Sequence, residues 1–204
     1  MIVIIDYGLG NLTSILNALN LLKIDCEISS DIEKIKKADK LILPGVGAFK
    51  EGMENLKKRG LIEVLNQEVL DKKKPILGIC LGMQLICKKS YEGGESSGLG
   101  WIDAEVIKFE LEDKKLRIPH VGWNDVECDL NCPLLKEGEQ NQTFYFVHSF
   151  YLKPKNKEII KGTCNYGSDF CAILEKDNIF ATQFHPEKSQ TEGLEILKKF
   201  TKIN

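Results

Sequence analysis

The chain has 204 residues, which suits one domain with a sizeable core, and its contents of hydrophobic (43%) and charged (28%) residues are ordinary for a globular protein. Its formal net charge of −2 gives no electrostatic reason to expect a nucleic acid or an anionic membrane as a partner. No apolar stretch approaches the ~20 residues needed to span a bilayer, and seven scattered cysteines without an export signal indicate reduced thiols in the cytoplasm. Since the cysteines form no paired Cys-x-x-Cys sets, we expect no structural metal.

The first half of the chain alternates short apolar runs with helical patterns. The run at 2–5 stops at Asp6 and lacks a cationic start, so it indicates a first strand and not a signal peptide. Further strands are predicted at 25–28, 40–43 and 75–79. The clearest helix follows the first strand and has an apolar stripe at helical spacing, made of Leu12, Ile15, Leu16, Leu19 and Leu22. This alternation predicts an α/β fold with a doubly wound parallel sheet, on which each helix buries its apolar face.

The second half holds strands closer together. Residues 101–184 contain several strand-like runs with turns such as the one at 176–178, and a helix near 190–201 closes the chain. The stretch 93–98 is predicted to be a flexible loop inside the domain, because nothing near it resembles a second core. Without a linker or a repeat, residues 1–204 read as a single domain.

Cys80 stands between two glycines where an apolar run gives way to a helical pattern. Gly78 and Gly82 lie two residues before and after it. Such glycines let the chain turn sharply from strand to helix without a Cβ clash, as in a nucleophile elbow. We expect Cys80 to lie exposed in a strained turn ahead of a helix N-terminus, where the helix dipole favours the thiolate. A buried cysteine at a strand end is the alternative for this motif alone.

Of the three histidines, His185 is the one best placed to act as a base. The segment 179–185 reads as an apolar strand ending at His185, and Pro186 should hold His185 extended and prevent immediate helix formation. Glu187 follows two residues on, where its carboxylate could accept the second ring N–H and stabilise the imidazolium. With Cys80 these residues would form a triad of nucleophile, base and orienting carboxylate. An ordinary surface loop is the alternative for the tripeptide alone.

A glycine pair follows the predicted strand 40–43. The backbone N–H groups of Gly45, Val46 and Gly47 could face a developing negative oxygen. Together with the N–H of Leu81, directly after the cysteine, they would form a two-donor oxyanion hole. A Pro-Gly turn that merely ends a strand is the alternative for this segment alone.

These motifs occur in the order that is typical of one family. The chain resembles the class I glutamine amidotransferases and, more narrowly, the glutaminase subunits of imidazole glycerol phosphate synthases, over residues 1 to about 200. The stretches Gly-Ile-Cys-Leu-Gly and His-Pro-Glu are shared across the wider family. The stretches 6–11 and 119–124 narrow the match to these glutaminase subunits. The motifs are Asp6-Tyr-Gly-Leu-Gly-Asn11, Pro44-Gly-Val-Gly-Ala-Phe49, Gly78-Ile-Cys-Leu-Gly-Met-Gln84, Ile118-Pro-His-Val-Gly-Trp-Asn124, Tyr145-Phe-Val-His-Ser149 and Gln183-Phe-His-Pro-Glu-Lys-Ser189.

The resemblance implies a flavodoxin-like class I amidotransferase fold with an additional antiparallel strand region in the second half. It also implies hydrolysis of L-glutamine to glutamate and ammonia through a thioester on Cys80, without a cofactor. Positions that hold the glutamine in the family match Gly47, Gln84, Ser149 and Phe150. The family position at Phe150 is commonly tyrosine, so only a backbone contact is carried over there.

A chain of this size has no room for a synthase domain, and ammonia released into neutral water would be protonated. The resemblance implies a (β/α)₈-barrel cyclase subunit that receives the ammonia within a 1:1 heterodimer and forms imidazole glycerol phosphate and AICAR in histidine biosynthesis. Positions at the subunit contact match Asn11, Trp123, Tyr145 and Lys188. Taken alone, these four would also fit a helix N-cap, two core aromatics and a solvated charge.

Two alternatives stay open at this point. The first is a paralogous amidotransferase subunit that supplies ammonia for a sugar in surface-polysaccharide or glycan biosynthesis. The second is a non-catalytic binding subunit or a cysteine hydrolase on the same core. The complete set of Cys80, His185 and Glu187 argues against an inactive subunit, and Gln84 together with the segment 44–47 argues for glutamine over a peptide substrate.

Overall fold

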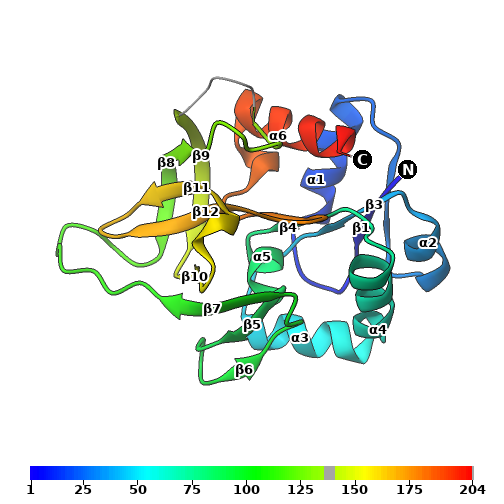
Figure 1. Cartoon of the computed structure of the whole chain (residues 1–204), viewed down its shortest axis with the longest axis horizontal. Coiled ribbons are helices and arrows are strands. Elements are labelled where there is room, and N and C mark those ends of the chain that lie inside the picture. The colour runs from blue at the N-terminus through cyan, green and yellow to red at the C-terminus, as the bar shows by residue number, and fades with distance from the viewer. Residues whose placement is uncertain (136–140, 204) are drawn as a thin grey trace.

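Two β-sheets form the framework of the chain, and a computed structural model describes them for residues 1–135 and 141–203. Among these residues, one sheet has nine strands in the order β2-β1-β3-β4-β13-β12-β11-β8-β9, and the other has four in the order β10-β7-β5-β6 (Figure 1). No described helix is long and apolar enough to cross a membrane.

The first five strands of the large sheet are parallel to one another. They are β2 (Cys26–Ser29), β1 (Ile2–Ile5), β3 (Lys40–Leu43), β4 (Ile76–Ile79) and β13 (Ile179–Thr182). The predicted strands of the first half are thus confirmed within a residue at each end, and the run at 2–5 lies between two other strands. Because the strands run in the same direction, their carboxyl ends gather at one edge of the sheet.

Helices cover both faces of this parallel part. Along β1, Val3 and Ile5 belong to one buried cluster, whereas Ile2 and Ile4 belong to the other. This alternation follows from the twofold period of a strand, and both faces are apolar because both are covered. On the face of Ile2 and Ile4 lie α1 (Leu12–Leu21) and α6 (Gln190–Lys202). On the other lie α2 (Ile32–Lys37), α3 (Phe49–Lys58), α4 (Leu61–Asn66), a π-helical turn η1 (Gln67–Asp71) and α5 (Leu81–Leu85). The doubly wound prediction is therefore confirmed.

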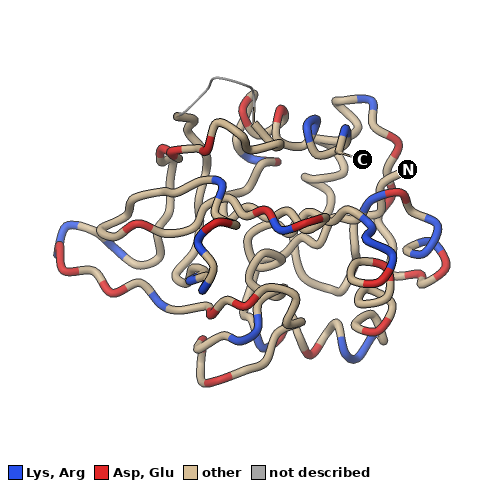
Figure 2. The backbone as a smooth tube through the Cα atoms, in the orientation of Figure 1, with Lys and Arg blue, Asp and Glu red and all other residues tan. Residues whose placement is uncertain are grey.

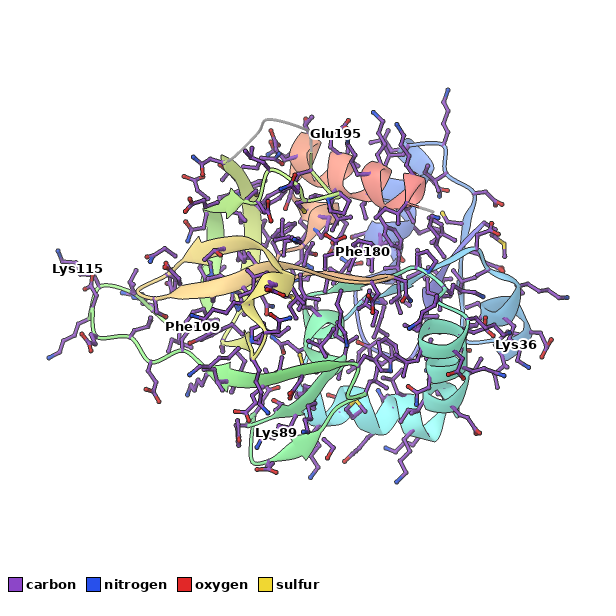
Figure 3. The ribbon with its side chains drawn as sticks, viewed as in Figure 1. Lys36, Lys89, Phe109, Lys115, Phe180 and Glu195 are labelled. Atoms are coloured by element: carbon purple, nitrogen blue, oxygen red, sulfur yellow. The ribbon has the colours of Figure 1, made fainter. Side chains whose placement is uncertain are left out.

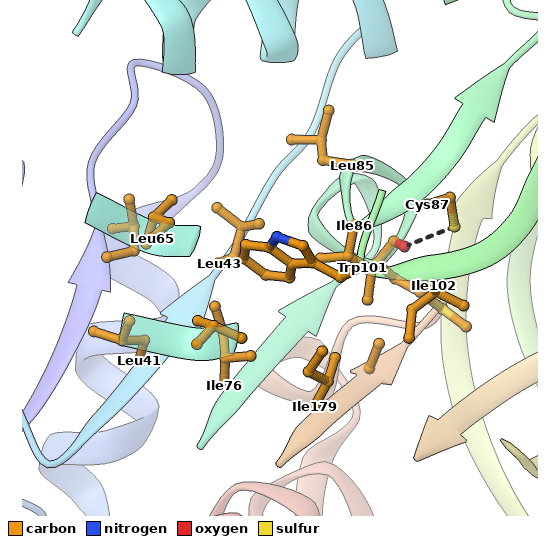
Figure 4. Packing of buried hydrophobic residues seen from close by; sticks show 14 of the residues in the cluster. Leu41, Leu43, Leu65, Ile76, Leu85, Ile86, Cys87, Trp101, Ile102 and Ile179 are labelled. Carbon is orange, nitrogen blue, oxygen red and sulfur yellow. Dashed lines mark hydrogen bonds between the residues drawn. The ribbon is translucent and has the colours of Figure 1, made fainter. Parts of the chain in front are cut away.

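Trp101 fills a large part of the core on the second face. It lies among aliphatic side chains of β3, β4 and α5, including Leu43 and Leu85 (Figure 4). Its indole nitrogen donates a hydrogen bond to Oδ1 of Asn66 over 2.7 Å, so the buried ring leaves no polar atom unpaired. This packing fixes α5, the helix that follows Cys80, against the sheet.

The second half of the chain supplies antiparallel strands, as expected. In the large sheet they are β12 (Asp169–Lys176), β11 (Ile160–Asn165), β8 (His120–Cys128) and β9 (Asn141–His148). The turn at 176–178 is confirmed as the tight connection between β12 and β13, with Asp177 at φ 54°. A short 3₁₀ turn, η2 (Lys157–Ile159), precedes β11.

The small sheet was not predicted from the sequence. It consists of β10 (Phe150–Pro154), β7 (Ile102–Lys108), β5 (Cys87–Ser90) and β6 (Ser96–Ser97). The prediction of a loop at 93–98 is wrong for residues 96–97, which pair with β5 in an antiparallel hairpin. Two serines give no apolar alternation, so this strand has no signature in the sequence.

Charged residues of both signs are spread along the whole backbone (Figure 2). The longest connection in the small sheet's neighbourhood joins β7 to β8 and carries Lys115 at its outer tip (Figure 3). The mixture of signs agrees with the near-neutral net charge.

Candidate active site

The turn between β4 and α5 holds Cys80 in a strained backbone conformation. Its φ of 52° and ψ of −106° lie outside the regions that L residues normally occupy. The neighbouring glycines are needed for close approach: a Cβ on Gly82 would lie 1.8 Å from the carbonyl oxygen of Leu43, and one on Gly78 would lie 3.0 Å from the nitrogen of Met83. The predicted elbow is therefore present.

The expectation that Cys80 is exposed is wrong. Its side chain lies at the bottom of a pocket and the residue is 6% exposed, because β9 covers it. Its Sγ lies 3.9 Å from the carbonyl oxygen of Val147 on that strand. The sulfur is thus reachable from the pocket and shielded from bulk water.

His185 and Glu187 form a tightly paired, buried unit. Nδ1 of His185 lies 2.8 Å from Oε1 of Glu187, and each side chain is 2% exposed. The strand β13 ends at Thr182, three residues earlier than predicted, and His185 is held by a 3.0 Å hydrogen bond from its backbone N–H to the carbonyl oxygen of Tyr145. Because a carboxylate only accepts, Nδ1 of His185 carries a proton and Nε2 faces the nucleophile.

The connection after His185 departs in part from the prediction. His185 is extended, with φ −100° and ψ 98°, as expected. However, a 3₁₀ turn, η3 (Pro186–Lys188), begins at once, because proline is well tolerated at the first position of a helical turn. The α-helix itself, α6, begins only at Gln190, after this turn.

The electrostatics favour a charged imidazole at His185. Burial alone lowers the pKa of His185, but the interactions with Cys80 and Glu187 outweigh burial and raise it to about 10. Nε2 of His185 is buried and has no partner in full hydrogen-bond geometry. Hydrogen bonds between a catalytic base and its nucleophile are commonly long or poorly aligned without substrate and tighten when it binds.

The loop after β3 lies beside the elbow. The carbonyl oxygen of Gly45 accepts a 3.3 Å hydrogen bond from the N–H of Leu81. One of the expected oxyanion donors is therefore engaged within the protein, and the two-donor hole is not assembled in this conformation. A Cβ on Gly45 would lie 2.2 Å from the hydroxyl oxygen of Tyr7, so only glycine fits there. Gly47 has a φ of 118°, which likewise requires glycine.

The predicted substrate residues surround one pocket of about 420 Å³ with Cys80 in its wall. A cavity of this size suits a small polar metabolite. Gln84 donates through Nε2 to the carbonyl oxygen of Phe150 over 3.0 Å, which ties α5 to β10 across the pocket. The lining residues are Val46, Gly47, Cys80, Leu81, Gln84, Glu92, Pro119, Val147, His148, Ser149, Phe150 and Lys188.

The residues expected at a subunit contact are at least partly exposed, and one of them, Lys188, lines the pocket. Trp123 is 47% exposed and packs edge-to-face on Tyr145, its cross-strand neighbour, with ring centroids 6.0 Å apart. Nζ of Lys188 lies 5.8 Å from the ring centre of Tyr145. The side chain of Asn11 caps α1 by accepting from the N–H of Ser14 over 3.4 Å. Trp123 is therefore not a core residue. Asn11 is the N-cap of α1, as the alternative interpretation of this residue predicted.

Comparison with known proteins decides the family. The model of the family "Glutamine amidotransferase class-I" matches residues 3–203. The chain belongs to the class-I glutamine amidotransferases. It is 52% identical to "Imidazole glycerol phosphate synthase subunit HisH 1" of Campylobacter jejuni strain RM1221 and 47% identical to "Imidazole glycerol phosphate synthase subunit HisH 2" of Pseudomonas aeruginosa strain PAO1, each over 203 residues and all of both chains. A solved structure entitled "Crystal structure of glutamine amidotransferase" superposes with a TM-score of 0.76 at 19% identity, covering 97% of this chain and 96% of the other, which shows a shared fold.

Two titratable residues of this amidotransferase pocket, Glu92 and His148, were not predicted from the sequence. Glu92 is the acidic member of the lining, and its Oε2 accepts from the N–H of Phe49 over 2.7 Å. It follows β5, a strand without a clear sequence pattern, so no local signal pointed to it. His148 was known as a histidine directly before Ser149, but its role depends on contacts across β8 and β10.

His148 and His120 form a buried pair of imidazoles, and both rings contact the ring of Phe109, whose position Figure 3 labels. Nδ1 of His148 donates to the carbonyl oxygen of Phe150 over 2.8 Å, so its Nε2 accepts from Nδ1 of His120 at 3.0 Å. Nε2 of His120 in turn lies 3.4 Å from Nδ2 of Asn124. Burial lowers the pKa of His148 to about 3 and that of His120 to about 4. Both are neutral at pH 7, so they hold the segment at Phe150 and do not serve as the base.

Proposed function

We propose that this chain is the glutaminase subunit of an imidazole glycerol phosphate synthase in the cytoplasm. In this role it hydrolyses L-glutamine to glutamate and ammonia and passes the ammonia to a cyclase subunit, which forms imidazole glycerol phosphate and AICAR in histidine biosynthesis. Membership of the class-I amidotransferases and the names of full-length relatives support this assignment. The main observation in its support is that the buried side chain of His185 interacts with both Cys80 and Glu187, and that Cys80 lines a metabolite-sized pocket.

The chemistry follows from the positions of these groups. The Cys80 thiolate attacks the side-chain amide carbon of glutamine and forms a tetrahedral oxyanion. As the C–N bond breaks, the imidazolium of His185 gives its proton to the leaving nitrogen, and a thioester and ammonia result. His185 then takes a proton from water, whose oxygen attacks the thioester, so that glutamate leaves and the thiolate returns. Glu187 accepts the Nδ1–H throughout and keeps the ring oriented.

The pocket lining is matched to a free amino acid. The carboxylate of Glu92 is suited to the α-ammonium group, and backbone groups at Ser149 and Phe150 are suited to the polar main-chain atoms of glutamine. Gln84 uses its N–H groups within the protein and so offers its carbonyl oxygen to a donor. An internal residue of a peptide has no free α-ammonium group, so a peptide substrate would leave the carboxylate of Glu92 without this partner.

The loop at Gly45 provides a means of control. The carbonyl oxygen of Gly45 and the N–H of Val46 belong to the same peptide unit. Rotation of that unit would release the N–H of Leu81 and turn the N–H of Val46 toward the pocket, which completes the oxyanion hole. One donor of this kind is worth roughly 10²–10³ in turnover. The resting chain is therefore a poor glutaminase and the partner switches it on.

The partner is a (β/α)₈-barrel cyclase subunit, bound as a 1:1 heterodimer over the pocket rim. Apolar residues are unusually exposed on β8 and the preceding segment: Val121 is 55% exposed, Trp123 47% and Ile118 38%. Val121 and Trp123 are two residues apart and share one face of the strand. Such a surface is typical of a protein interface, with Tyr145, Lys188 and Asn11 at its border.

The test compares glutaminase rates for this chain alone, with a cyclase barrel, and with the barrel and its nucleotide ligand. We expect a stepwise rise, which Gly47→Pro should eliminate because proline cannot adopt the φ of 118° found there. Equal rates in all three conditions would refute partner control. Restoration of growth in a histidine auxotroph that lacks this subunit tests the pathway, and failure to restore growth by a chain that is active as a glutaminase would favour the glycan-pathway alternative.

A further inference from the structure

Gln183 lies directly behind the nucleophile and takes no part in the mechanism above. It follows β13, two residues before His185, and is fully buried. Its Nε2 lies 3.7 Å from Sγ of Cys80, and its Oε1 lies 3.3 Å from Nε2 of Gln84. It is not among the residues that line the pocket, so a substrate would not touch it.

The neighbouring groups fix the orientation of both carboxamides. The carbonyl oxygen of Phe150 can only accept, so Gln84 must present Nε2 to it. The second hydrogen of that Nε2 then points to Gln183, which must present its Oε1 in return. The Nε2 of Gln183 is consequently left facing the sulfur, which is the arrangement a thiolate requires.

We propose that Gln183 is a further catalytic residue, whose buried carboxamide donates a hydrogen bond to Sγ of Cys80 and stabilises the thiolate. This inference rests on the proposed role of Cys80 as the nucleophile. A hydrogen bond to an ionised acceptor is stronger than one between neutral groups, and burial removes the competing water. Gln183 therefore favours thiolate over thiol before substrate arrives, and the same amide keeps Gln84 in position at the pocket.

The test is the alkylation rate of Cys80 in the isolated full-length chain, with iodoacetamide as the probe and peptide mass spectrometry to locate the adduct. Gln183→Met keeps a similar length and removes both hydrogen-bonding groups. On the acidic limb of the pH–rate profile, where the rate follows the thiolate fraction, we expect its rate to fall by about tenfold, the effect of losing one hydrogen bond to a charged group. At the alkaline plateau, where the thiol is fully ionised in both proteins, the two rates should converge. Tyr7 and His185, the groups that interact electrostatically with Cys80, are unchanged in this variant.

Thr182→Val is the matched control. Thr182 is the adjacent residue, is fully buried, and donates through Oγ1 to the carbonyl oxygen of Phe184 over 3.1 Å. The variant removes a buried hydrogen bond from the same segment without touching the sulfur, so its alkylation rate should equal that of the unchanged chain. If both variants slow alkylation equally, the effect is a general loosening and the proposal is wrong. A Gln183→Met rate within about twofold of that of the unchanged chain on the acidic limb would likewise overturn it.

A measurement on the unchanged side chain covers the case in which Gln183→Met does not fold. The side-chain amide resonances of Gln183, observed by ¹⁵N NMR, should shift when the Cys80 thiol ionises and should show no such step in Cys80→Ala. Absence of the step in the unchanged chain would overturn the proposal. Neither experiment uses glutamine, so failure of the proposed function, seen as glutaminase activity that survives in Cys80→Ala, is distinguishable from failure of this inference.

Discussion

Replacing Gly82 with alanine should separate the nucleophile from the loop that stabilises the oxyanion. The new Cβ would lie 1.8 Å from the carbonyl oxygen and 2.8 Å from the carbonyl carbon of Leu43, the last residue of β3. These are backbone atoms, so no side-chain rotation relieves the contact, and α5 and β3 must move apart by more than about 1 Å. A displacement of about 1 Å at a reacting group costs roughly 10² in rate. We expect glutamine-dependent turnover to fall by about that factor, with roughly 1–3 kcal/mol lost from the free energy of unfolding.

The assay measures glutamine-dependent and ammonia-dependent synthesis by the complex with the cyclase. Ammonia-dependent synthesis should be preserved in Gly82→Ala, since the cyclase is unaltered. Gly52→Ala serves as the control, because its Cβ would meet Leu85 side-chain atoms at 3.0 Å, which can give way, and it should change turnover little. If folded Gly82→Ala turned over glutamine as fast as the control, the close approach of α5 to β3 would not position the site.

Three further predictions concern single side chains. His185→Ala should abolish glutaminase activity while Glu187→Gln retains a small part of it, and externally supplied ammonia should bypass both lesions; loss of ammonia-dependent synthesis would show that these residues are structural. The pKa values of His120 and His148 are lowered in the folded chain, so the unfolded chain binds more protons below pH ~6.5. The free energy of unfolding should therefore fall by roughly 1.4 kcal/mol per pH unit for each histidine as the pH drops from there toward about 4. Urea titrations that give equal stability at pH 7 and pH 5 would contradict this. Trp123→Ala should raise the dissociation constant for the cyclase by about 30-fold or more, measured by calorimetry, and an unchanged constant would remove the exposed face of β8 from the interface.

The parallel half of the fold was predictable because its signals are local. The strands β1, β3 and β4 are almost entirely buried and read as short apolar runs, and the stripe on α1 has a clear period, with Ile15 and Leu19 buried as expected. The elbow was predictable for the same reason, since Gly78 and Gly82 are required by contacts within a few residues or across one strand. In such segments the sequence pattern and the tertiary structure require the same residues.

The rest depends on contacts between distant segments. The burial of Cys80 results from contact with Val147 on β9, 67 residues later in the chain, and no pattern in the sequence around the cysteine indicates that contact. Glu92 enters the pocket because β5 joins a small sheet whose strands have weak patterns. The peptide between Gly45 and Val46 can adopt two orientations, and the glycine-rich sequence is compatible with both, so the sequence does not predict which one the chain adopts.

The most direct test of the central claim is the site of covalent labelling by a glutamine-analogue electrophile. The complex would be treated with the analogue, digested, and mapped by mass spectrometry across all seven cysteines. We predict an adduct on Cys80 and loss of glutamine-dependent turnover in proportion to labelling, with protection by glutamine. Labelling mainly at the more accessible Cys26, or at the buried Cys87 or Cys171, with Cys80 unmodified would contradict the account.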